Sequence, residues 1–331
     1  MSNTNKTINN PSLSRIISEI RFKDTGSFID YFEEKLVQFK NTKSISYHKH
    51  LTSKLNNLKE FLNKQDLLFT ELNVSFLNRF EAYLMDSKRD KGALNSNSAI
   101  SNLRAIRTIL YEAIKEERYE GKNPFYVKKL SEFKVVKMKL SIQEVKNLEG
   151  LELEKGSSLW HTKNYFLFAF YAAGTRFSDI AQLKWDNIQE GRLSFIMDKT
   201  EKGHSINLIP KALEILEQYR NPTSRPDSFV FPIFDSWVKD ADLKTLQSQI
   251  GSKNAMINVD LKKIQKLAEI EKKMTFHLSR HSFADILRSK GASVYDIKNL
   301  LGHSDIKITE RYLKGFDTET SDKALNEGLD F

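Results

Sequence analysis

The sequence contains no cysteine, no apolar run of membrane-spanning length and no internal repeat. Without cysteine the chain has neither disulfides nor thiolate metal sites, which fits a reducing cytoplasm. A membrane-spanning helix needs about 20 consecutive, mostly apolar residues. Residues 1–14 are rich in Ser, Asn and Thr and lack the apolar core of a signal peptide, so residues 1–21 are predicted to be a flexible arm. A cytoplasmic protein without a membrane partner is therefore expected.

Positive charge is present in excess. The 331 residues include 52 Lys and Arg against 43 Asp and Glu, which gives a net charge of +9 at pH 7 and a pI near 9.3. This surplus indicates an anionic partner, and nucleic acid is favoured over a membrane surface. The length suffices for two domains of about 100–200 residues, each with its own core.

Residues 22–124 are predicted to form an all-helical domain, because apolar residues recur there at three- and four-residue steps. Ser96 or Ser98 is the expected N-cap of the last helix. Proline forbids helix continuation, so Pro124 marks the end of the domain. The four expected helices span residues 25–40, 45–62, 74–87 and 96–117.

Basic side chains on these helices and in the following segment suggest contact with a polyanion. Lys49, Arg104 and Arg107 lie on predicted helices, where they either face DNA phosphates or form an ordinary solvated surface. Between Lys122 and Lys139 there are six lysines and a single acidic residue. Residues 125–140 are therefore predicted to be a basic linker, either lying along DNA or simply solvated.

A second domain is predicted for residues 141–315. It opens on a capping box, Ser141 with Glu144, and continues into a strongly apolar helix that breaks at Ala173-Gly174. Arg176 follows, a charge at the end of a nearly continuous apolar run. Burying an arginine is costly unless an anion pairs with it, and either Asp179 or a bound phosphate fits that requirement.

A β-hairpin is predicted between residues 192 and 210, because the apolar period changes to two. Its turn is expected at Glu201-Lys202-Gly203-His204. An extended strand would place Lys199 on the same face as Leu193, Phe195 and Met197, whereas Lys202 would lie in the turn and contact a phosphate loosely. Residues 236–258 show no clear pattern.

The C-terminal part contains residues suited to chemistry on a phosphodiester. His277, Arg280 and His281 are followed by His303 and Tyr312, at spacings that a helix-turn-helix folds onto one spot. A phenol can attack phosphorus while cations stabilise the developing charge. Taken singly, each residue also has a simpler interpretation: His277 as a helix cap, Arg280 as a solvated side chain and Tyr312 as a half-buried core aromatic.

The ordered set resembles the tyrosine recombinase (phage integrase) family, and in style the integrases of Bacteroides-type mobile elements. The resemblance covers the whole second domain. It implies a mainly α fold with a small β-sheet, in which a helical core-binding (SAM-like) DNA-binding domain precedes a mixed α/β catalytic domain. The matching stretches are Ala173-Gly174-Thr175-Arg176, Lys199 after 23 residues, His277-Leu278-Ser279-Arg280-His281-Ser282-Phe283-Ala284, Leu300-Leu301-Gly302-His303, and Tyr312 nine residues later.

The resemblance implies a site-specific recombinase that cuts and rejoins DNA through a 3′-phosphotyrosine link. Tyr312 would attack the phosphate, and His277 would accept or orient the proton of the phenol. Arg176 and Arg280 would hold the non-bridging oxygens, because planar guanidinium groups bind them well. His303 would donate to the same oxygens.

The remaining roles are also implied by the resemblance. Lys199 would protonate the leaving 5′-oxygen as a general acid. Asp179 and His281 would support the other groups. Neither metal, ATP nor another cofactor is expected to take part.

The expected partner is double-stranded DNA with inverted-repeat core sites, bound by a homotetramer in association with the nucleoid. Residues 316–331 carry a short amphipathic pattern that would dock on a neighbouring subunit, unless they are a frayed terminus. An accessory DNA-bending or directionality factor is left open. Two alternatives are a type IB topoisomerase and a catalytically silent DNA-binding relative. The helical domain and the tail argue against the first, and the complete set of six residues argues against the second.

Overall fold

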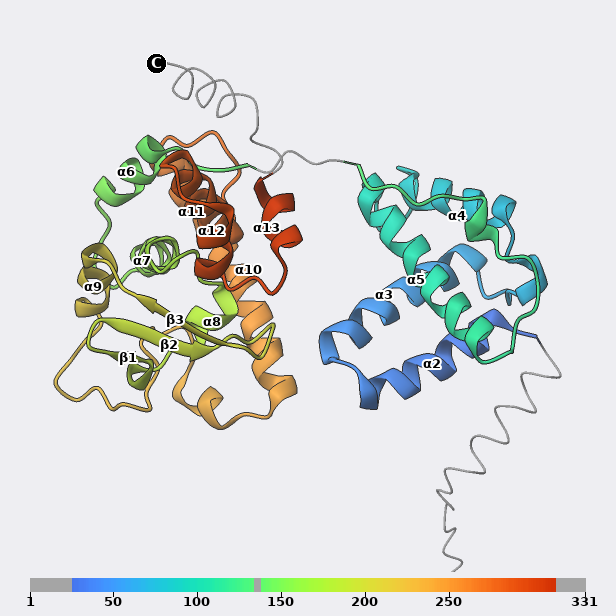
Figure 1. The fold of residues 1–331 in the computed structure, drawn as a ribbon, viewed down its shortest axis with the longest axis horizontal. Coiled ribbons are helices and arrows are strands. Elements are labelled where there is room, and N and C mark those ends of the chain that lie inside the picture. The colour runs from blue at the N-terminus through green and yellow to red at the C-terminus, as the bar shows by residue number, and fades with distance from the viewer. Residues whose placement is uncertain (1–25, 134–137, 314–331) are drawn as a thin grey trace, which may run out of the picture. The chain divides into compact units, whose positions relative to one another are not determined.

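The computed structural model describes residues 26–133 and 138–313, apart from the side chains of Lys239 and of residues 311–313. The chain divides into two units, residues 1–135 and 136–331. Figure 1 shows that the first is built of helices and that the second combines helices with a small β-sheet. The predicted fold class, mainly α with a small sheet, is thus confirmed.

Within residues 26–133, the first unit packs four α-helices around an aromatic core. Each helix begins after a Ser or Asn whose side chain accepts a hydrogen bond from a backbone amide in the first turn. The helices are α2 (Phe28–Thr42), α3 (Ile45–Leu62), α4 (Val74–Met85) and α5 (Ser96–Lys115), with short 3₁₀ turns η1 (Phe69–Glu71) and η2 (Pro124–Tyr126).

The expected N-cap of the last of these helices, Ser96 or Ser98, was wrong. Asn95 caps α5, and its side-chain oxygen accepts from the Ser98 amide at 2.9 Å. Ser96 and Ser98 already lie inside the helix. Asn, like Ser, is a favoured cap, so residue type alone did not distinguish between neighbouring candidates.

A buried ion pair joins the first and last helices of this unit. The Lys35 side chain is almost fully buried and donates to Glu116, at the end of α5. The Tyr31 hydroxyl donates to the same carboxylate at 2.8 Å. A lysine among apolar side chains needs such partners, because an unpaired buried charge is strongly unfavourable.

The second unit is organised around helix α7, which packs against α9, α10 and α11 (Figure 1). Its side chains are apolar on most sides, as befits a helix enclosed by others. Before it, Ser141 and Glu144 form the predicted capping box of α6. The helices are α6 (Ile142–Gly150), α7 (Ser158–Tyr171), α8 (Phe177–Ala181), α9 (Pro210–Glu217), α10 (Leu243–Leu267), α11 (His277–Ser289), α12 (Val294–Leu300) and α13 (Ile306–Leu313), with 3₁₀ turns η3 (Trp185–Asn187) and η4 (Ser236–Asp240).

Three antiparallel strands, β1 (Ile188–Gln189), β2 (Arg192–Ile196) and β3 (Gly203–Asn207), form a sheet in the order β1-β2-β3. The hairpin turn differs from the prediction. The Met197 amide donates to the Lys202 carbonyl at 3.0 Å and closes the turn, while Gly203 and His204 already belong to β3. Glu201, rather than the glycine, takes the left-handed conformation, with φ 54°.

The segment without a clear sequence pattern, residues 236–258, forms η4 and the first part of α10. That part of α10 is largely half-buried or exposed, so no single apolar face marks it in the sequence. Within residues 26–133 and 138–313, none of the helices combines the length and apolar character that crossing a membrane requires.

Candidate active site

The turn between α7 and α8 places Arg176 at the start of α8. Ala173 and Gly174 both adopt positive φ, 55° and 67°, which reverses the chain directly after α7. A Cβ on Gly174 would lie only 3.0 Å from the Cα of Arg280, so a side chain there would crowd the backbone of α11. Glycine at this position therefore allows α11 to approach the turn that carries Arg176.

Arg280 is buried, with 3% of its surface exposed, and joins two turns of the chain. Its Nη1 donates to the Gly174 carbonyl at 2.8 Å, and its Nη2 donates to the Leu301 carbonyl. The interpretation of Arg280 as a solvated side chain is wrong. These two bonds hold the guanidinium group in a fixed orientation between the α7–α8 turn and the end of α12.

His303 follows in the turn between α12 and α13 and is also buried. Its Nδ1 lies 2.8 Å from the Thr309 hydroxyl oxygen on α13. The preceding Gly302 has φ 62°, and a Cβ on it would lie 2.6 Å from the Met197 sulfur. The histidine turn thus packs against the end of β2.

Asp179 connects this cluster to the hairpin. Its carboxylate is buried and accepts a hydrogen bond from the Asp198 amide at 2.9 Å. Burial raises the pKa of Asp179 above its ordinary value, although the Asp198 amide and the charges of Arg176 and Arg280 act in the opposite direction. Arg176 itself places its Nη1 3.5 Å from the Met197 sulfur.

Lys199 lies in the hairpin turn and is exposed. The expectation that it continues the buried face of β2 is wrong, because the strand ends at Ile196 and Met197 is the last buried residue of the alternating series. Lys199 is nevertheless next to Asp198, whose amide is bound to Asp179. Lys202, at the other end of the turn, is exposed as well.

His277 and His281 stand on the first turns of α11, with ring centroids 4.5 Å apart and nearly perpendicular planes. His277 is exposed and is the first residue of the helix. It does not cap α11, because the cap position is Phe276, where there is no side-chain capping bond. Tyr312 belongs to the last turn of α13, and its side chain lies outside the described part of the structure.

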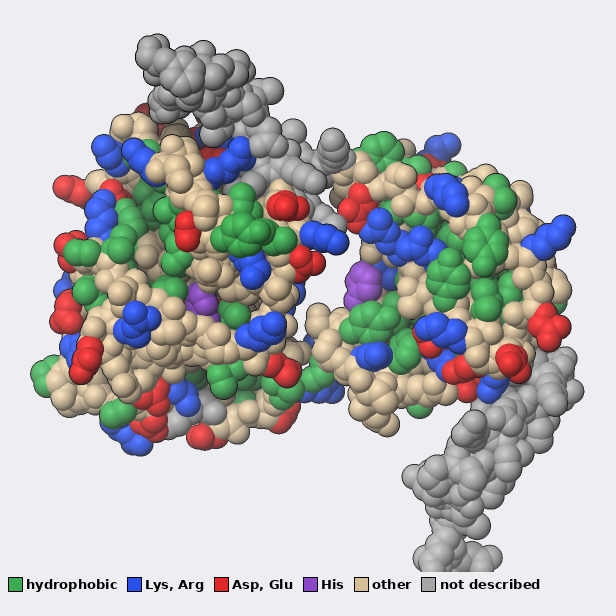
Figure 2. Space-filling view, viewed as in Figure 1, with side chains coloured by type: hydrophobic (Ala, Val, Ile, Leu, Met, Phe, Trp, Pro, Cys, Tyr) green, Lys and Arg blue, Asp and Glu red, His purple; other side chains and the backbone are tan. Residues whose placement is uncertain are grey.

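The predicted DNA contacts of the first unit differ in their surroundings. Lys49 is exposed on α3, and Arg107 is half-buried on α5. Arg104 forms an ion pair with Glu132. In Figure 2, Lys and Arg side chains are spread over the visible face of this unit, and most visible Asp and Glu side chains lie toward its lower edge.

One residue of the cluster was not among the predicted site residues. His204, the second residue of β3, is half-buried. Its Nδ1 lies 3.3 Å from the position that a Cβ on Gly302 would take. Burial, together with the charges of Arg280 and Arg176, lowers its pKa, and a hydrogen bond with the Leu300 backbone acts in the opposite direction. A histidine near a hairpin tip carries no local signal that would identify such a contact.

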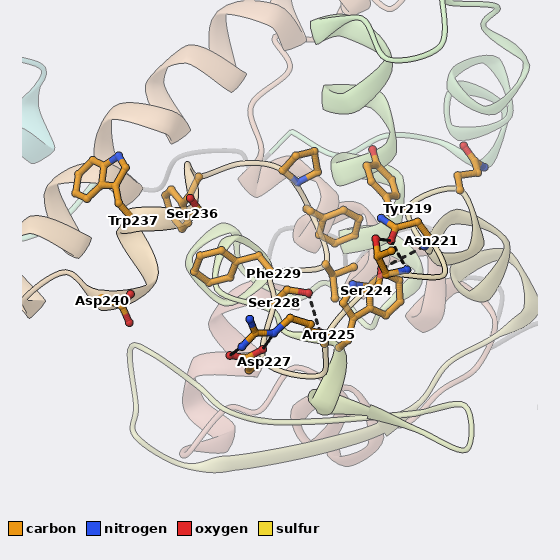
Figure 3. A pocket seen from close by; sticks show the side chains of 17 residues that line it. Tyr219, Asn221, Ser224, Arg225, Asp227, Ser228, Phe229, Ser236, Trp237 and Asp240 are labelled. Carbon is orange, nitrogen blue, oxygen red and sulfur yellow. Dashed lines mark hydrogen bonds and ion pairs between the residues drawn. The ribbon is translucent and has the colours of Figure 1, made fainter.

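The second unit also contains a cleft that lies away from the predicted site residues (Figure 3). It measures about 780 Å³, within the range of ligand pockets, and is lined by aromatic residues such as Tyr219, Phe229 and Trp237 and by the Arg225–Asp227 ion pair. Among the residues that the structure describes, its lining includes none of the predicted site residues. In the same described part of the chain, no cluster of His, Asp and Glu could hold a metal ion.

The two units match known families of one class, the tyrosine recombinases, which are DNA strand transferases. Residues 142–319 match the phage integrase family, and residues 27–135 match the phage integrase SAM-like domain. The chain belongs to the phage integrase family.

Similar proteins support the same class. A tyrosine recombinase of Pseudothermotoga lettingae is 28% identical over 75% of this chain and 82% of its own length. The tyrosine recombinase XerC of Rickettsia bellii is 26% identical over 81% of this chain and 87% of its own length.

Two solved structures show the same fold. A lambda integrase dimer bound to a COC′ core site has a TM-score of 0.65 at 15% identity, covering 95% of this chain and 83% of that one. The Tn1549 transposon integrase in complex with transposon right end DNA has a TM-score of 0.65 at 16% identity, covering 91% and 98%.

We expect Asp179→Asn to change the pH dependence of stability. A carboxyl group whose pKa is raised in the folded state stabilises the fold fully below its unfolded pKa, and this contribution is lost as the pH rises through the folded pKa. The ordinary value for Asp179 is 3.8. The free energy of unfolding of the wild type, relative to the variant, should therefore fall as the pH increases from about 4.

Urea unfolding of both proteins across this pH range measures the difference. Asp235→Asn, measured in parallel, is a control for replacing an exposed Asp by Asn. A growing advantage of the wild type at higher pH would contradict the unfavourable burial of the Asp179 carboxylate.

Proposed function

We propose that this recombinase cleaves DNA through attack of Tyr312 on a phosphate held by Arg176, Arg280 and His303. The observation that carries the proposal is the fixed guanidinium of Arg280, bound to two backbone carbonyls in the same cluster as Arg176. Both arginines act electrostatically on Asp179, so both lie near this carboxylate. A convergent pair of guanidinium groups suits the non-bridging oxygens of a phosphodiester.

Proton transfer is assigned to groups at the edge of this cluster. The exposed His277 would accept or orient the proton of the phenol, whose ordinary pKa is about 10. Lys199 would protonate the leaving 5′-oxygen, and its neighbour Asp198 is tied to the cluster through Asp179. His281, beside His277, is given a supporting role.

Family membership favours recombination over the two alternatives. The relatives described above are recombinases, so neither topoisomerase activity nor a silent DNA-binding role is favoured. We assign DNA binding to a core-binding domain at residues 22–124 and catalysis to residues 141–315. Residues 125–140 are assigned as a basic linker between them, and residues 1–21 as an N-terminal arm.

Assembly on DNA is part of the same proposal. Four copies of the chain would bind inverted-repeat core sites at the nucleoid, each docking residues 316–331 on a neighbour. A lambda integrase tetramer bound to a Holliday junction, with a TM-score of 0.61, supports this arrangement by analogy of fold. The motifs of the second unit favour a likeness to the integrases of Bacteroides-type mobile elements. An accessory DNA-bending or directionality factor is compatible with the proposal.

The first test concerns the nucleophile. A nicked suicide substrate should trap a covalent protein–DNA adduct, which mass spectrometry should locate at Tyr312. Tyr312→Phe should abolish the adduct while leaving DNA affinity nearly unchanged, because only the attacking oxygen is removed. Tyr295, exposed at the start of α12, offers a control: Tyr295→Phe should still form the adduct. An adduct on any other tyrosine would contradict the assignment.

The second test separates the two lysines of the hairpin turn. Lys199→Ala should slow cleavage of normal DNA by about 10²–10⁴-fold, the usual contribution of a general acid. Replacing the scissile 5′-oxygen by sulfur should largely restore the rate, because sulfur leaves without a proton. Lys202→Ala should be mildly affected on both substrates. If the sulfur substrate instead restores the cleavage rate of Lys202→Ala, the general acid is Lys202 and the assignment to Lys199 is wrong.

The third test compares two basic residues of the first unit. Lys49→Gln should weaken DNA binding and reduce the salt slope by about one, as expected for the loss of a phosphate contact. Arg104→Gln should have a smaller effect, because Glu132 already neutralises that arginine. DNA affinities measured over a series of salt concentrations show which of the two variants loses more binding. A larger loss for Arg104→Gln would show that its ion pair opens on DNA.

A further inference from the structure

His204 occupies the strand that follows the catalytic hairpin turn, and its ring is directed at the turn after α12. It pairs across the hairpin with Phe195, with ring centroids 5.6 Å apart at 83°. Its Nδ1 lies 3.3 Å from the position that a Cβ on Gly302 would take. A hydrogen bond with the Leu300 backbone acts to raise the pKa of the ring. The histidine thus contacts the segment that leads directly into His303.

Two adjacent residues of this segment are contacted from different sides. The ring of His204, on the hairpin, lies against Gly302, and Arg280 of α11 donates to the Leu301 carbonyl. Burial and the nearby charges of Arg280 and Arg176 lower the pKa of His204, which favours its neutral form. A neutral ring can still donate through one nitrogen, so the contact adds no further positive charge to the cluster.

The hairpin turn is consequently anchored on both flanks of Lys199. Before the lysine, the Asp198 amide is bound to Asp179, and Met197 packs against Gly302. After it, the ring of His204 packs against Gly302. An exposed lysine in a turn is effective as a general acid only when the turn holds it near the leaving oxygen, since small displacements cost large rate factors.

We propose that His204 is a positioning residue of the recombination reaction, which holds the Lys199 turn against the turn that carries His303. The inference rests on the proposed general-acid role of Lys199. His204 itself touches no reacting atom. Its loss should therefore slow the step that needs the lysine proton, and leave DNA binding and the arginine contacts in place.

The test uses the full chain and two substrates, normal DNA and DNA with a 5′-bridging sulfur. His204→Phe retains an aromatic partner for Phe195 but removes the donor, and His204→Gln retains a donor. His161 provides a matched control, because it is another half-buried histidine of the same unit, on α7, with its Nδ1 3.1 Å from the Tyr219 hydroxyl. Amide hydrogen exchange of residues 197–203 reports directly on the anchoring.

His204→Phe should cleave normal DNA about 10- to 100-fold more slowly, a part of what a general acid contributes. The sulfur substrate should restore its rate to near the wild-type value, His204→Gln should recover part of the loss, and exchange in the turn should be faster in His204→Phe. His161→Phe should show no difference between the two substrates. DNA affinity should be unchanged in all of these variants.

Equal slowing of His204→Phe on both substrates would overturn the proposal, because it would reveal a general structural defect. A wild-type rate on normal DNA would overturn it as well. Lys199→Ala, measured in parallel, separates the two levels of inference. If sulfur fails to rescue Lys199→Ala, the general-acid assignment is wrong and the His204 proposal falls with it. If sulfur rescues Lys199→Ala but not His204→Phe, only the role of His204 is wrong.

Discussion

The arrangement of the site depends on the burial of one guanidinium group. Arg280 lies inside the second unit, where an unsatisfied charge would be strongly unfavourable, and two backbone carbonyls accept its hydrogen bonds. One belongs to Gly174 and the other to Leu301, so the arginine joins turns that are more than 120 residues apart in the chain. The same two hydrogen bonds therefore orient the Arg280 guanidinium and hold the two turns together.

Close backbone approach makes this interaction geometrically feasible. Gly174 and Gly302 both have positive φ, and a Cβ on either would come within 3.0 Å of another part of the site. The first glycine admits the backbone of α11, and the second admits Met197 at the end of β2. The candidate site is therefore assembled largely from turns that pack against one another and are supported by the helices.

Positive charge in this protein is not equally available for binding. The net charge of +9 describes the whole chain, yet Arg104 is neutralised by Glu132 and Lys35 is buried against Glu116. Lys49, by contrast, is exposed on α3. The number of basic residues indicates an anionic partner. The ion pairs decide which basic side chains are available to bind its phosphates.

The sequence by itself determined what depends on residue type and local period. Helical periodicity, the Ser141–Glu144 capping box and the alternation that ends at Met197 all follow from neighbouring residues, and the ordered motifs sufficed to identify the family. Tertiary structure decided the position of Lys199, the partners of Arg280 and the contact of His204. Local patterns record which face of an element is apolar, but contacts between distant turns depend on how the elements pack, and no short stretch of sequence contains that information.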